Sequence, residues 1–129
     1  MNTKWIMTTA SLLLGVSGIV LTFAPDLIIS SLGINPTHVS VLLGQIIGGL
    51  YFGFAMLNWM TKESLIGGIY NRPVAVANLT HFMIAGLALA KASISNTELP
   101  TLILIVSVAY VLLAILFGII LFRHPLPDK

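Results

Sequence analysis

The sequence contains no cysteine and few charged residues, and each of these absences excludes a class of protein. Without cysteine there is no thiolate nucleophile, no disulfide exchange and no cysteine-ligated metal site. Charged residues make up 8% of the chain, whereas a soluble domain carries about 25% because its surface must face water. The six basic residues are scattered singly, so the chain lacks the clustered basic patch that binds nucleic acid. We therefore expect a membrane protein with no nucleic-acid partner.

Apolar residues dominate instead, at 57% of the chain, with a mean hydropathy of +1.04. They gather in four stretches, at about 5–23, 39–60, 73–90 and 102–122. A helix needs roughly 20 apolar residues to cross the ~30 Å hydrocarbon core of a bilayer. The pattern predicts an all-α fold, a single domain over residues 1–129 that forms an integral membrane four-helix antiparallel bundle.

The first stretch also has features of a signal peptide, with Lys4 before an apolar run and Ala24 as a cleavage site. The run exceeds the usual core of about 7–15 residues, and Pro25 would follow the cut. We therefore expect a retained helix. After it, Pro25 and Asp26 suit a helix N-terminus and Gly33 suits a C-terminal cap. These residues predict a short interfacial helix between the first two membrane helices, over residues 25–32.

The basic residues also predict the orientation, because cytoplasmic loops retain positive charge. In the expected topology five of the six lie on one side, namely Lys4, Lys62, Arg72, Arg123 and Lys129. Only Lys91 lies on the other side. We therefore expect both termini in the cytoplasm.

Small and polar residues follow one face of each predicted helix, and such faces let membrane helices pack closely and form hydrogen bonds. These faces are Thr8, Ser11, Gly15, Gly18 and Thr22; Gly44, Gly48, Tyr51, Ala55 and Asn58; Asn78, His81, Ala85 and Ala88; and Ser107, Tyr110, Ala114 and Gly118. The second helix has two glycine pairs on adjacent faces, Gly44 with Gly48 and Gly49 with Gly53. One pair could serve a neighbouring copy of the chain, or both could pack within one monomer.

A polar cluster is predicted near the middle of the membrane. At ~1.5 Å per residue, His81 and Tyr51 lie at similar depths, about 12–14 Å from the cytoplasmic boundary. The other members of the cluster are Asn78, Tyr110, Asn58 and Gln45. A titratable group at this depth is a candidate functional residue. His81 could bind or protonate a lipophilic ligand such as a quinone headgroup, or it could act as a hydrogen-bonded contact between helices.

Catalysis and metal binding have little support in the sequence. A metal site normally takes three or four ligands, and the membrane segments offer one histidine and no carboxylate. The chain also lacks a nucleophile–base pair and a glycine-rich phosphate loop. We therefore assign no catalytic residue and no metal ligand, and the sequence leaves the identity of any cofactor open.

The order of features resembles that of the DoxX-like small bacterial membrane proteins. The matching runs are LLLGVSGIVLTFAPDLIISSLGI, GQIIGGLYFGFAMLNWM and NRPVAVANLTH. The resemblance implies a four-helix bundle but no dependable activity. Small multidrug transporters, fluoride channels and glutathione-linked membrane enzymes fit less well, since their characteristic residues are missing.

From these features we expect a protein of the bacterial inner membrane that binds a lipid or lipophilic small molecule, or serves as an accessory subunit of a larger membrane-protein partner. One alternative is a small homo-oligomeric transporter or channel subunit. Another is a redox membrane protein that uses His81 at a quinone site.

Overall fold

The computed structural model describes residues 2–64, 69–96 and 98–122, and the regular structure of these residues is entirely helical. Its elements are α1 (Thr3–Phe23), α2 (Pro25–Ser31), α3 (His38–Thr61), the short 3-10 helix η1 (Ile69–Asn71), α4 (Arg72–Ser95) and α5 (Thr101–Phe122). The all-helical prediction is therefore confirmed for the described part of the chain. Arg123 and Lys129, which entered the orientation argument, lie outside the described residues.

Four of these helices are long and apolar enough to cross a membrane, as the sequence predicts for a multi-pass membrane protein. They are α1, α3, α4 and α5, with 21, 24, 24 and 22 residues. The helix α4 continues to Ser95 rather than ending at residue 90. The apolar run ends there, but Lys91, Ala92 and Ser93 are compatible with a helix, and the chain leaves it only at Asn96, four residues before Pro100.

The short helix α2 forms as predicted, with Pro25 at its first turn. It ends in a Schellman motif: the N–H of Gly33 donates to Ser30 O at 3.0 Å, and the N–H of Ile34 donates to Ile29 O at 3.3 Å. Gly33 has a φ of +76°, a left-handed conformation that glycine adopts without a steric penalty. The predicted cap at Gly33 is confirmed.

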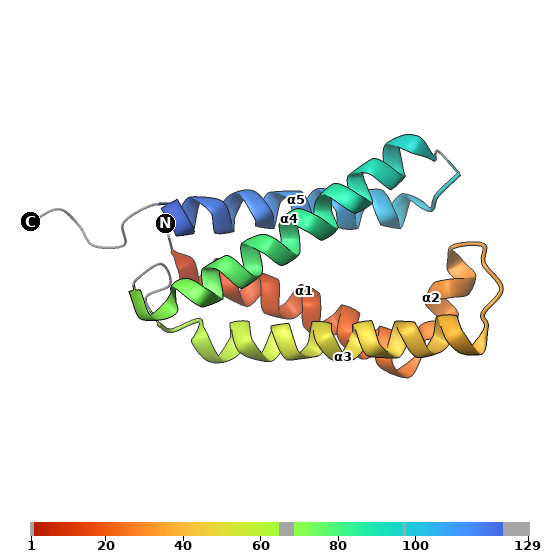
Figure 1. Cartoon of the computed structure of the whole chain (residues 1–129), viewed down its shortest axis with the longest axis horizontal. Helices are drawn as coiled ribbons and strands as arrows, with labels where there is room; N and C mark the ends of the chain where they lie inside the picture. Colours follow the sequence, from red (N-terminus) through yellow and green to blue (C-terminus); the bar gives the residue numbers. More distant parts are fainter. Residues whose placement is uncertain (1, 65–68, 97, 123–129) are drawn as a thin grey trace, which may run out of the picture. The chain divides into compact units, whose positions relative to one another are not determined.

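The described structure consists of two compact units, of which the first is Met7–Thr61. In this unit α1 and α3 run in opposite directions (Figure 1). The two backbones touch at Gly18 and Gly48: a Cβ added to Gly18 would lie 2.9 Å from Gly48 O and 2.7 Å from Phe52 N. Ser11 Oγ donates a hydrogen bond to Ala55 O at 2.7 Å. The small, polar face predicted for the first helix therefore packs on α3.

The second unit comprises Met1–Ile6 and Lys62–Lys129, and α4 crosses α5 within it (Figure 1). The buried face of α4 carries Ala75, Asn78, Phe82 and Gly86. This differs from the predicted face, because Phe82 is fully buried while Ala88 is exposed. Phe82 was not among the residues of the predicted packing face, yet its ring packs against Tyr110 and Phe117 of α5.

An ion pair within the second unit joins the start of α1 to the loop after α3. Lys4 Nζ lies 2.9 Å from Glu63 Oε1, and both side chains are largely exposed. The hydrogen bond from Lys4 lowers the pKa of the Glu63 carboxyl group below its ordinary value. The ion pair therefore brings the first turn of α1 close to the residues that follow α3.

Candidate functional site

The helices α4 and α5 approach each other closely at Gly86. A Cβ added to Gly86 would lie 3.3 Å from Tyr110 Cβ and 3.3 Å from Val111 N, so the two backbones approach each other at this point. Because straight helices that cross at one point diverge on either side of it, the remaining space must be filled by side chains or left open. Both outcomes occur along this pair.

An aromatic cluster of Phe82, Tyr110 and Phe117 fills the centre of the contact. All three side chains are buried, with exposed fractions of 0%, 1% and 0%. The rings of Phe82 and Tyr110 meet edge to face at 5.1 Å, and those of Phe82 and Phe117 stack at 5.7 Å. These are favourable aromatic geometries, and they hold α4 and α5 together over about two helical turns.

Three of the six candidate residues lie at or beside this cluster. The His81 ring is 5.7 Å from that of Tyr110 and half-buried. Asn78 is fully buried, and its Nδ2 donates to Val74 O on the preceding turn at 2.9 Å. The structure therefore brings His81 and Tyr110 together, with Asn78 one turn away on the same helix.

The other three candidates belong to α3, in the first unit. Asn58 is fully buried and donates from Nδ2 to Phe54 O at 2.9 Å, which repeats the arrangement at Asn78. Tyr51 is half-buried and Gln45 is exposed.

Gln45 forms part of a stripe on the outer face of α3, which we call the α3 outer stripe. The stripe follows helical spacing and consists of the exposed residues Leu42, Gln45, Gly49, Gly53 and Met56. A Cβ added to Gly49 or Gly53 would meet no heavy atom of the described chain within 4 Å. In contrast, Gly44 packs on Pro25, and Gly48 packs on Gly18 and Thr22. The two glycine pairs of this helix thus face different surroundings.

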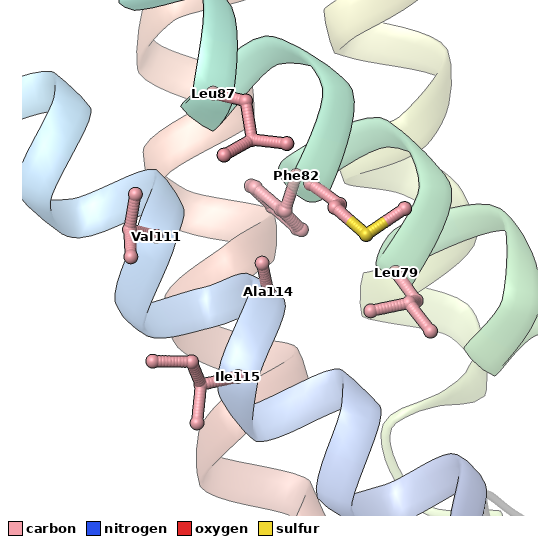
Figure 2. A pocket seen from close by; sticks show the side chains of 7 residues that line it. Leu79, Phe82, Leu87, Val111, Ala114 and Ile115 are labelled. Carbon is pink, nitrogen blue, oxygen red and sulfur yellow. The ribbon is translucent and has the colours of Figure 1, made fainter. Parts of the chain in front are cut away.

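Grooves between α4 and α5 are a feature that the sequence did not predict. The Leu79 groove has a volume of about 250 Å³ and is lined by Leu79, Phe82, Met83, Leu87, Val111, Ala114 and Ile115. Figure 2 shows these side chains around the space between the two helices. The lining is almost wholly carbon.

Two further spaces continue along the same helix pair. The Ile94 groove, of about 280 Å³, is lined by Ala90, Ser93, Ile94, Leu104, Ser107, Val108, Val111 and Leu112. The Asn96 cavity, of about 240 Å³, lies at the loop and is lined by Ser93, Asn96, Leu99, Pro100, Thr101 and Leu104. Val111 lines the first two spaces, and Ser93 and Leu104 line the last two, so the three spaces are neighbours along the helix pair.

Among these three grooves of the described structure, none is lined by any of the six candidate residues. The helix geometry explains this for His81. Met83 and His81 flank Phe82, so they point about 100° away from it in opposite senses. The Leu79 groove lies on the Met83 side, which leaves His81 on the other flank of the contact. The candidate site predicted from the sequence consists of polar residues. The grooves, in contrast, lie beside a small residue, Gly86, and are lined mainly by large apolar residues.

Within the described residues, no three histidine or acidic side chains lie close enough to hold a metal ion. The chemistry that remains at the α4–α5 pair is apolar contact, with a few hydroxyl and amide groups at the loop. Comparison of the chain with protein-family models, with curated proteins and with solved structures gave no match in any of the three.

Proposed function

We propose that the chain is a lipid-binding or lipophilic small-molecule-binding module of the bacterial inner membrane, which acts alone or as an accessory subunit of a larger membrane protein. The observation that carries this proposal is the Leu79 groove, an open space of about 250 Å³ with an apolar lining. This volume is just below the range of about 300–1,000 Å³ for drug-sized ligands. It suits one acyl chain or a small lipophilic molecule.

The surroundings of the groove support a ligand from the bilayer. Met83 and Leu87, which line it, are 46% and 63% exposed, and the neighbouring Ile84 is 62% exposed. In a membrane these side chains would contact lipid tails, so a tail could enter the groove without crossing a polar barrier. Moving a lipid tail from the bilayer into the groove gives no hydrophobic free energy, because both surroundings are apolar. Van der Waals packing against the groove would therefore hold the ligand.

The membrane orientation is part of the same proposal. With both termini in the cytoplasm, Lys4 would precede the first membrane crossing and Glu63 would follow the second, so both residues would lie at the cytoplasmic surface. Their ion pair, which joins the start of α1 to the end of α3, supports this arrangement. The loop between α4 and α5 would then lie on the opposite, non-cytoplasmic side of the membrane.

His81 has a packing role in this proposal. Its ring lies beside Phe82 and Tyr110, and it lines none of the three described grooves. The quinone-site alternative therefore has less support than the lipid site.

A first test fills the Leu79 groove. Ala114 lines the groove with a small side chain, so Ala114→Phe should occupy part of its volume and reduce the amount of co-purified lipid about tenfold or more. Native mass spectrometry of the protein released from nanodiscs measures the bound lipid. Ile105→Phe is the matched control, since Ile105 is 61% exposed on the same helix and lines none of these grooves. Equal lipid retention by the two variants would contradict the proposal.

We also propose that two copies of the chain associate through the α3 outer stripe. In lipid, a hydrogen bond to the exposed Gln45 amide would stabilise the association of two helices. Across a two-fold axis, the Gln45 side chains of two copies can each donate one hydrogen bond and accept one from the other. Gly49 and Gly53 would allow the close approach that this requires. The alternative of a homo-oligomeric transporter or channel subunit would need such an interface.

The test of this association is the dimer dissociation constant in detergent, measured by energy transfer between labelled copies. Gln45→Leu should raise it about threefold to twentyfold, the range of one interhelical hydrogen bond in a membrane. Leu50→Ala, at a position 62% exposed and outside the α3 outer stripe, should leave it unchanged. A monomer at all concentrations, or equal effects of the two changes, would rule out this interface.

A further inference from the structure

The Asn96 cavity and the Ile94 groove are neighbouring spaces that differ in chemistry. The Ile94 groove is lined almost wholly by carbon, whereas polar atoms make a substantial part of the cavity lining. Ser93 and Leu104 line both spaces. A ligand that occupies both would therefore need an apolar part and a polar part, in contact with each other.

The polar groups of the Asn96 cavity offer hydrogen-bond donors. Asn96 Oδ1 accepts the N–H of Glu98 at 3.1 Å, which leaves the amide nitrogen of Asn96 to donate. Thr101 adds a hydroxyl group at the first residue of α5. Ser93 Oγ already donates to Leu89 O at 2.9 Å, so this hydroxyl can act only as an acceptor. A ligand group rich in acceptor oxygens fits the cavity better than a cationic one.

Together the Asn96 cavity and the Ile94 groove extend along α5 over about the depth of one leaflet. From Thr101 to Val111, α5 rises about 15 Å, at ~1.5 Å per residue. That is about half of the ~30 Å hydrocarbon core. The cavity lies where α4 ends and α5 begins, and therefore at the level where a lipid headgroup meets the hydrocarbon region.

We propose that a membrane phospholipid binds along this path, with its phosphate and ester oxygens in the Asn96 cavity and one acyl chain in the Ile94 groove. The proposal rests on the proposed lipid-binding function and specifies its ligand class. Free phosphate would leave the apolar groove empty, and a lipid without a phosphate would offer the donors of Asn96 and Thr101 only its neutral ester and hydroxyl oxygens, which are weaker acceptors than a phosphate. In the proposed orientation the ligand comes from the outer leaflet.

The experiment uses nanodiscs that contain equal amounts of phosphatidylglycerol and of diacylglycerol with the same chains. Native mass spectrometry compares how much of each lipid the full-length chain retains. The wild-type chain should retain phosphatidylglycerol preferentially. Asn96→Asp keeps the acceptor for Glu98 N–H but replaces the donor amide with a negative charge, so it should reduce phosphatidylglycerol retention at least about tenfold and leave diacylglycerol unchanged.

Ser95→Asp is the matched control, because it adds the same charge one residue away at an exposed position outside the cavity lining. It should retain phosphatidylglycerol as the wild-type chain does. Equal losses in the two variants, or no loss in Asn96→Asp, would overturn the headgroup site while leaving the lipid-binding function intact. A wild-type chain that retains neither lipid would overturn both proposals. Thermal unfolding of each variant identifies any loss of lipid retention that follows from misfolding. If Asn96→Asp misfolds, Thr101→Val provides a second variant, which removes only a hydroxyl group of the cavity and should also reduce phosphatidylglycerol retention.

Discussion

Gly48→Ala is expected to destabilise the chain by about 1–3 kcal/mol, the usual cost of forcing an extra methyl group into a closely packed contact. A Cβ at this position would lie 2.7 Å from Thr22 N and 2.9 Å from Gly18 O. Both atoms belong to the α1 backbone, so no side-chain rotation relieves the clash and the two helices must separate. Thermal or denaturant unfolding in detergent measures the change.

The neighbouring residue supplies the control. Gly49 belongs to the same helix but has open space around an added Cβ. Gly49→Ala should therefore be neutral or stabilise the monomer by up to about 0.5–1 kcal/mol, because alanine restricts the unfolded chain more than glycine does. If both substitutions had the same effect, the close backbone contact between α1 and α3 would be wrong.

Phe82→Ala should cost roughly 2–4 kcal/mol. Phe82 is fully buried and contacts both Tyr110 and Phe117, so its removal leaves a cavity at the centre of the α4–α5 contact. In soluble proteins a buried Phe→Ala substitution costs about 3–5 kcal/mol, and part of this cost is the lost free energy of transferring the side chain out of water. That part is smaller for a helix in a membrane, because its surroundings are already apolar. The change in unfolding free energy in detergent tests this value.

The comparison for this substitution is Ile84→Ala, two residues further along α4. Ile84 is 62% exposed, so its truncation should change the unfolding free energy by less than about 0.5 kcal/mol. A cost at Phe82 no larger than that at Ile84 would mean that the aromatic cluster does not hold the two helices together.

The sequence predicts the helices well because length and apolar character determine them locally. The four long helices begin and end close to the predicted positions, except that α4 continues five residues beyond its predicted end, and Pro25 and Gly33 mark the short helix between the first two. The close contact of α1 with α3 also follows from sequence, since Gly18 and Gly48 lie on small-residue faces. Local rules of this kind need no knowledge of the helix partners.

The grooves could not be predicted in this way, because they depend on the angle at which α4 and α5 cross. The spacing of Asn78 and His81 suggested one face of α4, but the observed contact is centred on Phe82 and Gly86. A shift of one residue turns a helix by about 100° and so changes which residues line a groove. On α3 the sequence placed Gly44 and Gly48 on a packing face, but it left open whether Gly49 and Gly53 pack within the monomer or against a second copy.

Photochemical labelling tests the lipid groove most directly. A phospholipid that carries a diazirine in its acyl chain is incorporated into nanodiscs with the full-length chain, activated by light, and its attachment sites are mapped by mass spectrometry. The lipid-binding account predicts labels concentrated on the groove linings of α4 and α5, at residues such as Met83, Leu87, Val108 and Ile115. Labels spread evenly over exposed residues of α1, α3, α4 and α5, with no preference for the groove linings, would contradict it.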